Sequence, residues 1–314
     1  IKKIDVVDAD EFKYKIHFNV AEGVFHPIDD SLSQLPELGM IVPVPEIGHS
    51  VEQAFTIMSN TNLLLKDCNV WSACKFMFYI ARNEGRVVFE NFNVTPDPAE
   101  NNGDIYIVGW RDGFHCKENR AQLIWKDCTL KYVYDDMYNI TCSMLKVDSV
   151  DGDKINLMWP ETKGAYGLIK EGDTVSFYNT KTGEKVGTTE VTSANGDTIT
   201  IKDDLDVSKG LYVAVDSLAA PNSQILNCDI KGTLRFRSPI YIADSDIHCT
   251  RMWIAFEIAG GNFLEGPVPE NILFSNCKFT FDNESEKFIE VFSSATDKIV
   301  TAAKNGKLAQ EDAY

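Results

Sequence analysis

Three aspartates stand where a repeating pattern of short strands should bring separate segments together. Asp112 begins the segment Asp112-Gly113-Phe114-His115, and Asp135 and Asp136 begin Asp135-Asp136-Met137-Tyr138-Asn139 roughly two dozen residues later. Carboxyl groups held close together do not all ionise with equal ease, so at least one is expected to keep a proton near neutral pH. One protonated acid beside ionised ones is the combination that hydrolyses glycosidic bonds. The three aspartates therefore predict acid–base hydrolysis without a metal or other cofactor.

Six short segments repeat one pattern of strand, polar corner and strand, and these repeats would position the acids. The segments are 63–70, 87–94, 123–130, 224–230, 240–247 and 272–279. Each carries an aspartate or asparagine at the corner, where the side chain can bond nearby backbone and tolerate a tight bend; these residues are Asp67, Asn91, Asp127, Asn227, Asp244 and Asn276. Spacings of roughly two to four dozen residues indicate coils with loops of variable length. We therefore expect an all-β chain built on a right-handed parallel β-helix.

Adjacent coils in such a stack lie about 4.8 Å apart, and one coil separates Asp112 from the later pair. Neighbouring residues on a straight strand point to opposite faces, so Asp135 and Asp136 can share a cleft only if the strand bends between them. The polar and aromatic residues around the pair permit such a bend.

Four of the eight cysteines follow the corner residue directly: Cys68, Cys128, Cys228 and Cys277. We expect them to point inward as a column of free thiols, because a thiol packs as a small apolar group. No Cys-x-x-Cys pair and no Cys/His spacing indicates zinc.

The pattern changes between residues 147 and 217, where short alternating segments are separated by polar turns such as Asp151-Gly152-Asp153 and Asn195-Gly196-Asp197. Such turns are typical of antiparallel hairpins. We therefore predict N-terminal β-helix coils over 1–146, an inserted small antiparallel β-barrel over 147–217, and C-terminal coils with a terminal segment over 218–314. The insertion is expected to act as a lid or wall that shapes the cleft, in preference to an independent sugar-binding module.

A formal charge of −17 argues against nucleic acid and anionic membranes as partners, because the field of the protein would repel both. No apolar run is long enough to cross a bilayer, and the first residues contain no signal-peptide core. Phosphate loops, nucleophile-elbow motifs and zinc-protease helices are also missing from the sequence.

The segments around the three aspartates resemble glycoside hydrolase family 110. The likeness rests on Asp112-Gly113-Phe114-His115, on Asp135-Asp136-Met137-Tyr138-Asn139, and on the later segments 232–237 and 253–276. It covers most of residues 45–280, although Ile140-Thr141-Cys142 departs from the family pattern. The resemblance implies an exo-acting, inverting hydrolase that removes terminal α-1,3-linked galactose from glycans, in a secreted or periplasmic location. By a looser analogy with polygalacturonases, Asp135 is assigned as general acid, and Asp112 and Asp136 as the water-activating pair.

The remaining candidate residues are expected to bind the glycan. Arginines at 235 and 237 alternate with Phe236 and should share one strand face, and tryptophans could stack on an apolar sugar face. The substrate-binding candidates are His115, Asn139, Trp110, Arg235, Arg237, Trp253, Glu257 and Glu265.

Two other functions stay open from the sequence. The same scaffold could be a polysaccharide lyase that uses calcium or a basic side chain beside the acids. It could also be a non-catalytic glycan-binding solenoid whose acids are ordinary turn residues. The sequence leaves open whether two copies pair as a homodimer.

Overall fold

The computed structural model describes residues 3–8, 13–17, 53–71, 73, 76–97, 108–160, 164–180, 184–257, 265–281 and 289–294. The side chains of residues 3, 4, 6, 8, 13–17, 250–257, 281 and 289–294 lie outside that description. The chain divides into two units, 1–44 and 45–314. Within the first unit, β1 (Lys3–Asp8) and β2 (Lys13–His17) pair antiparallel.

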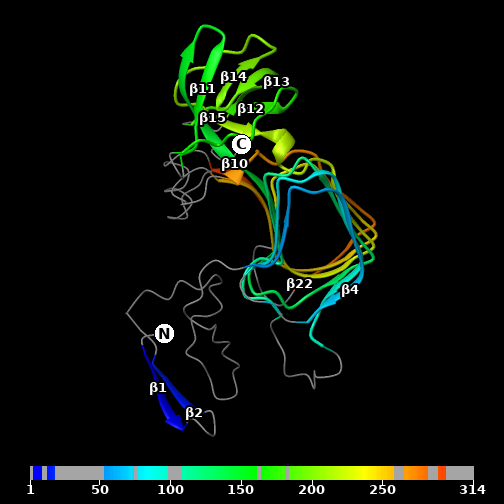
Figure 1. Ribbon diagram of the computed structural model, residues 1–314. Helices are drawn as coiled ribbons and strands as arrows, with labels where there is room; N and C mark the ends of the chain where they lie inside the picture. The colour runs from blue at the N-terminus through cyan, green and yellow to red at the C-terminus, as the bar shows by residue number, and fades with distance from the viewer. Residues whose placement is uncertain are drawn as a thin grey trace. The chain divides into compact units, whose positions relative to one another are not determined.

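The second unit is all β, and most of its strands pair in parallel along three ladders that the chain visits in turn (Figure 1). Ladder 1 contains β3 (Gln53–Met58), β5 (Phe76–Ala81), β7 (Phe114–Lys117), the start of β10 (Asp136–Asp151), the end of β17 (Asp229–Phe236), the end of β19 (Asp246–Glu257) and β23 (Ile289–Ser294). Ladder 2 contains β4 (Thr61–Val70), β6 (Glu84–Val94), β8 (Gln122–Lys126), β16 (Ser223–Leu226), β18 (Ile240–Ala243) and β21 (Ile272–Ser275). Ladder 3 contains the ends of β4 and β6, β9 (Thr129–Leu130), the starts of β17 and β19, and β22 (Lys278–Phe281).

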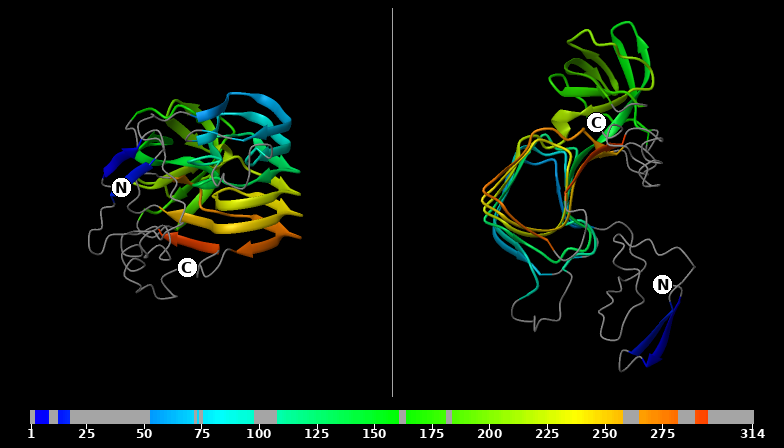
Figure 2. Two further views of the ribbon diagram at one scale, coloured as in Figure 1. Left: turned by 90° about the horizontal axis from the view of Figure 1, so that it is seen from below. Right: turned by 180° about the vertical axis from the view of Figure 1, so that it is seen from behind.

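The side view in Figure 2 shows these strands lying one above another. All six repeated segments are strands of ladders 2 and 3, so their parallel stacking is confirmed.

The predicted corner residues are also confirmed. Asp67, Asn91, Asp127, Asn227, Asp244 and Asn276 all have φ between 47° and 55°. This left-handed conformation is one that asparagine and aspartate tolerate better than most residues. Their side chains also bond from coil to coil: Asn91 donates to Asp67 at 2.7 Å, Asn227 to Asp127 at 2.6 Å, and Asn276 to Asp244 at 2.6 Å.

Aromatic rings fill the interior behind ladder 1. Phe78 stacks on Phe114 at 5.0 Å between centroids, and Phe114 stacks on Tyr138 at 5.4 Å. The cysteines that the structure describes are all free, which agrees with the predicted thiols at Cys68, Cys128, Cys228 and Cys277. A reduced thiol next to a tight corner packs there without needing a partner.

The inserted segment forms a closed antiparallel barrel of six strands. Around the ring these are the end of β10, β11 (Lys154–Met158), β14 (Thr198–Ile201), β13 (Lys185–Asn195), β12 (Thr174–Tyr178) and β15 (Tyr212–Val215). The barrel has a core of its own. Its first strand is a continuation of ladder 1, because β10 pairs with β7 through Thr141 and with β15 from Met144 onward. The 3-10 turn η2 (Asp216–Leu218) leads back to the ladders.

The start of the molecule differs from the expectation that coils occupy residues 1–146. The described strands of residues 1–44 pair antiparallel in a separate unit, and parallel stacking is described only from Gln53 onward. A run of alternating apolar and polar residues fits either kind of pairing, so the sequence pattern could not distinguish them. Among the described residues, no helix is long and apolar enough to cross a membrane.

Candidate active site

The three aspartates lie together at the edge of ladder 1, where β7 and β10 begin. One carboxylate oxygen from each of Asp112, Asp135 and Asp136 lies within 4.8 Å of the other two. Asp112 and Asp136 are buried and Asp135 is half-buried. The expected clustering of these carboxylates is therefore observed.

The chain bends at Tyr134 and Asp135, directly before β10 begins at Asp136, and a β-bulge follows on β10 itself. The register of β10 against β17 shifts between Asp136, which pairs with Thr233, and Tyr138, which pairs with Leu234. One extra residue on β10, Met137, therefore opposes β17 at this point. A bulge re-aims the side chains beside it, so Asp136 joins the acids while Tyr138 returns to the core.

Four of the eight binding residues predicted from the sequence lie on adjacent strands beside the acids. Register places His115 next to Asn139, Asn139 next to Arg235, and Arg235 next to Trp253 on successive strands of ladder 1. Alternation of buried and partly exposed residues on β7 and β17 shows that His115 and Arg235 face outward. Side chains about one strand spacing apart can contact one ligand together.

Arg235 links these binding residues to the acids. Its guanidinium contacts Asp136 Oδ2 at 2.8 Å and Glu265 Oε2 at 3.2 Å. Arg237, with 3% of its surface exposed, donates to the Glu265 carbonyl at 3.3 Å. Asn139 Nδ2 donates to Glu265 Oε1 at 3.5 Å. Glu265 comes from β20 (Glu265–Gly266), which pairs antiparallel with β10, and so a distant segment closes one side of the site.

Burial decides how the carboxyl groups of the site ionise. Burial, together with the charges of Asp112 and Asp135, raises the pKa of Asp136 from 3.8 to about 7, even though Arg235 acts to lower it. Burial and Asp112 also raise the pKa of Asp135. Burial acts to raise the pKa of Glu265 as well. The charges of Arg237 and Arg235 outweigh this effect and hold the pKa of the Glu265 carboxyl below its usual value. Asp136 is therefore the carboxyl most suited to carry a proton at neutral pH, rather than Asp135 as the sequence analogy assigned.

His115 contacts the remaining acid directly. Its Nδ1 lies 2.6 Å from Asp112 Oδ2. The imidazole packs against two aromatic rings of β5, with centroids 4.8 Å from Phe76 and 5.9 Å from Tyr79. A ring held in this way fixes the orientation of the Asp112 carboxylate.

Three of the predicted binding residues are not joined to the acids by a described contact. Trp110 packs its ring against Tyr134 at 5.8 Å. Trp253 and Glu257 lie on β19, where only the backbone is described. Of these two, Trp253 has its backbone beside Arg235 in the register.

The structure adds residues that the sequence reasoning did not select. Arg111 Nε lies 3.2 Å from Asp135 Oδ2, and the Arg111 guanidinium lies over the Phe76 ring at 4.8 Å. Tyr79 occupies the position next to His115 one coil earlier. Aligning the segment 76–81 with 114–117 as successive coils would have found Phe76 and Tyr79, because residues in register on parallel strands become neighbours.

The same three carboxylates could also ligate a divalent cation, because hard cations such as Ca²⁺ bind carboxylate oxygens. Among the described residues they form the one group of three or more potential ligands placed in this way.

A comparison with models of known protein families gives no match. A comparison with curated proteins gives no match either.

Proposed function

We propose that the three ladders form a right-handed parallel β-helix and that the protein is an exo-acting glycoside hydrolase that removes terminal α-linked galactose, with α-1,3 as the preferred linkage. The observation that carries the hydrolase proposal is the cluster of Asp112, Asp135 and Asp136 with oxygens within 4.8 Å, one of them buried enough to hold a proton. The sugar and the linkage rest on the resemblance of these segments to glycoside hydrolase family 110.

In the proposed mechanism Asp136 is the general acid. Arg235 binds its Oδ2, which leaves Oδ1 to hold the proton that passes to the departing glycosidic oxygen. Asp112, oriented by His115, and Asp135 together bind and deprotonate the attacking water. Hydrolysis then proceeds in a single displacement with inversion at the anomeric carbon.

The spacing of the acids makes stereochemistry a demanding test. Inverting enzymes usually hold their two carboxyl groups about 6.5–9.5 Å apart and retaining enzymes about 5–5.5 Å apart. The three acids here are closer than the inverting spacing. Inversion therefore requires that two of them bind the water jointly at one side of the cluster, while the third faces the leaving oxygen.

Galactose recognition is assigned to the binding residues on ladder 1. Arg235 and Asn139 can donate to sugar hydroxyls, and Trp253 is proposed to pack on the apolar face of the ring. Location outside the cytoplasm and pairing of two copies stay predictions from the sequence.

The experiment is a panel of α- and β-linked galactosides assayed by anomer-resolved NMR. We expect turnover of α-1,3-linked galactosides with β-galactose as the first product. Asp136→Asn should lower kcat by 10²- to 10⁴-fold, on the scale of general acid catalysis. Asp148→Asn, a change at an exposed aspartate paired with Lys209 on the barrel side of β10, is the matched control. If α-galactose is released first, the enzyme retains the anomeric configuration and the proposed inversion is wrong. If no α-galactoside is hydrolysed, the proposed activity is refuted.

A second candidate, a calcium-dependent polysaccharide lyase, is favoured by one observation: the three acids can ligate a cation, and the basic side chain of Arg235 lies beside them. Lysis would give unsaturated products that absorb in the ultraviolet and would stop after chelation of divalent ions. Glycan binding that survives Asp136→Asn, with no turnover by the wild type, would instead favour a binding solenoid.

A further inference from the structure

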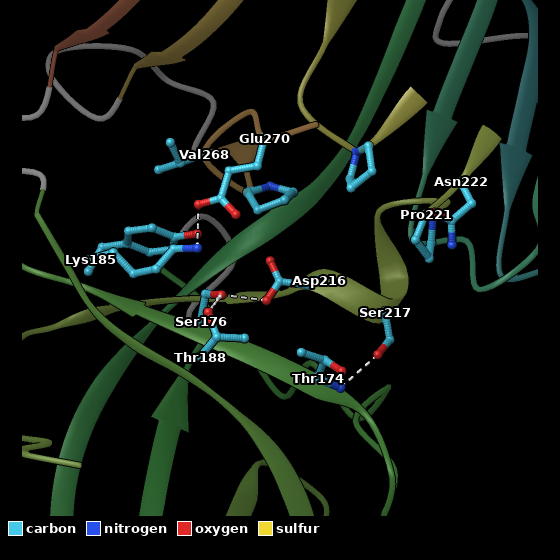
Figure 3. A pocket seen from close by; sticks show the side chains of 13 residues that line it. Thr174, Ser176, Lys185, Thr188, Asp216, Ser217, Pro221, Asn222, Val268 and Glu270 are labelled. Atoms are coloured by element: carbon cyan, nitrogen blue, oxygen red, sulfur yellow. Dashed lines mark hydrogen bonds and ion pairs between the residues drawn. The ribbon is translucent and has the colours of Figure 1, made fainter. Parts of the chain in front are cut away.

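A hollow lies between the barrel and the ladders. It is a pocket of about 380 Å³, lined from the barrel side by β12, β13 and η2, and from the other side by segments next to β16, β17 and β20 (Figure 3). Its volume is at the lower end of the range of about 300–1,000 Å³ found for small-molecule sites. None of the three aspartates of the candidate active site lines it.

One wall of the pocket is a chain of hydroxyl groups ending on a buried carboxylate. Ser176 Oγ donates to Asp216 Oδ2 at 2.6 Å and lies 2.7 Å from Thr188 Oγ1. Figure 3 shows the other carboxylate oxygen of Asp216 directed toward the side of the pocket where Glu270 lies. Burial raises the pKa of Asp216 to about 6, so this carboxylate is ionised at neutral pH but only partly hydrated. It therefore favours a ligand that can donate hydrogen bonds.

The opposite wall is mostly apolar. Pro221, Pro239, Pro267 and Val268 line it, and none of their side chains can form hydrogen bonds. The charges of Lys185 and Glu270 are paired with each other across the pocket edge. A pocket with hydroxyl and carboxylate groups on one side and an apolar surface on the other matches a sugar ring, which carries hydroxyls at its rim and C–H groups on its face.

The pocket is too far from the three acids for one sugar unit to bridge them. Gly266, next to Pro267 in the pocket wall, pairs with Cys142, which is six positions along β10 from Asp136. Six residues of extended strand span about 20 Å. The two places therefore act as separate sites.

We propose that this pocket is a binding site for a neutral sugar residue, held by Asp216, Ser176 and Thr188 and packed against the proline wall. The ionised Asp216 carboxylate disfavours acidic sugars and phosphorylated ligands. The proposal does not depend on the reaction at the three aspartates.

The test is calorimetry on the full chain at pH 7 with a panel of galactose, glucose, mannose, fucose and N-acetylglucosamine. We expect at least one of these sugars to bind. Asp216→Asn and Thr188→Val should each raise its Kd by tenfold or more, because each removes a group that the sugar contacts. Thr188→Val preserves the shape of the side chain, which makes a folding defect easy to recognise by circular dichroism. Ser193→Ala, at an exposed position on the same strand β13, is the matched control.

Asp136→Asn separates this proposal from the proposed hydrolase activity. Binding that is kept in Asp136→Asn and weakened in both pocket variants supports the pocket, whether or not any glycoside is hydrolysed. Binding that is lost in Asp136→Asn but unchanged in both pocket variants assigns the sugar to the acid site and overturns the proposal. No binding of any of the five sugars, or binding only of a cationic amine such as putrescine, overturns it as well.

Discussion

The ionisation of one residue, Asp136, governs the proposed chemistry. Asp136 is 6% exposed, its carboxyl group lies beside two other acids, and the pKa of that group is raised to about 7. If the proton of Asp136 is the one delivered to the leaving group, activity should be lost as pH rises through about 7. The pH dependence of kcat/KM on an α-galactoside checks this expectation. An alkaline limb well above pH 9 would assign the proton to a different group.

The same raised pKa predicts a change in stability that does not depend on any substrate. A carboxyl group whose pKa is higher in the folded than in the unfolded state stabilises the fold below its unfolded pKa, and this contribution is lost as pH rises through the folded pKa. For Asp136 that window runs from 3.8 to about 7. Since each pKa unit corresponds to about 1.4 kcal/mol, Asp136→Asn should gain a few kcal/mol relative to the wild type between pH 4 and pH 8.

Denaturant unfolding of both proteins across this pH range measures that difference. Asp148→Asn, an exposed aspartate, should follow the wild type at every pH. A difference between Asp136→Asn and the wild type that stays constant with pH would contradict the assigned pKa.

At the residue scale, much of the site could be predicted from the sequence, because the repeat places residues one coil apart next to each other. This reasoning brought Asp112 to the later aspartates and placed His115 beside Asn139. It could not say which aspartate holds the proton. That choice depends on how deeply each carboxyl group is buried and on Glu265, which approaches from a distant strand to share Arg235.

At the scale of elements, the bulge at Met137 and the glycine that faces it set the geometry of the acids. A Cβ atom on Gly113 would lie 2.9 Å from the Met137 carbonyl oxygen, closer than such atoms approach in folded proteins. Gly113→Ala should therefore push β7 and β10 apart beside Asp112 and Asp136. Overpacking of this kind costs about 1–3 kcal/mol, and we expect kcat/KM to fall at least tenfold.

Gly187→Ala, on barrel strand β13, is the matched control for that change. Its added Cβ would meet the terminal methyl groups of the half-buried Leu205 at 2.8 and 2.9 Å, and the end of a side chain can move where a backbone carbonyl cannot. Activity assays and thermal unfolding of both variants provide the measurement. Equal losses of activity in the two variants would show that the bulge does not position the acids.

The corners between ladders 2 and 3 should be sensitive to residue type. Asn227 has φ of 51° and donates to Asp127 at 2.6 Å. Asn227→Ala keeps the left-handed conformation at a cost of about 1–2 kcal/mol and also removes the hydrogen bond, worth about 1 kcal/mol. Asn227→Gly removes only the bond and adds backbone entropy. We expect the free energy of unfolding to decrease from the wild type to the glycine variant and from the glycine variant to the alanine variant. An alanine variant at least as stable as the glycine variant would contradict the proposed role of Asn227.

These corners were also the most predictable elements of the fold. At each corner a single aspartate or asparagine adopts the left-handed backbone conformation that the bend requires, and its side chain bonds to the corner residue of a neighbouring strand. A second row of amides was not predicted. Asn83, between β5 and β6, is fully buried, and its side chain donates to that of Asn119 at 2.9 Å. Asn119 lies between β7 and β8, so both residues stand where the chain passes from ladder 1 to ladder 2. The two residues stand in segments of different length and composition, so no fixed spacing marks them in the sequence.

At the scale of the whole second unit, the question is how the barrel is fixed to the ladders. The hairpin turns predicted an insertion over 147–217, and the barrel strands run from the second half of β10 to β15. The joint itself could not be predicted. Arg120, at the end of one coil, binds Asp173 through Nε at 2.8 Å and donates to the Leu168 carbonyl at 2.6 Å. These partners come from parts of the chain with unrelated patterns.

A second contact supports the same joint. Glu118 accepts a hydrogen bond from the Ser143 backbone at 2.9 Å and another from the Tyr166 hydroxyl. Asp173 is 4% exposed and Glu118 is 5% exposed. Both carboxylates are therefore withdrawn from water at the place where barrel and ladders meet, and each depends on its partner for compensation.

Removal of Arg120 should therefore loosen the barrel more than the loss of a surface ion pair would. Arg120→Ala leaves Asp173 buried without its cation, which typically costs about 3–5 kcal/mol. In the double variant Arg120→Ala with Asp173→Asn, the buried charge is also gone, so the combined loss should be smaller than the sum of the single losses. We expect Arg120→Ala to unfold in two denaturant transitions, with the barrel unfolding first, whereas the wild type unfolds in one.

Lys209→Ala, which removes an exposed ion pair with Asp148, is the control and should change the free energy of unfolding by less than about 1 kcal/mol. Strictly additive losses, or a single transition in every variant, would mean that the barrel is fixed to the ladders by β10 and its packing rather than by this ion pair.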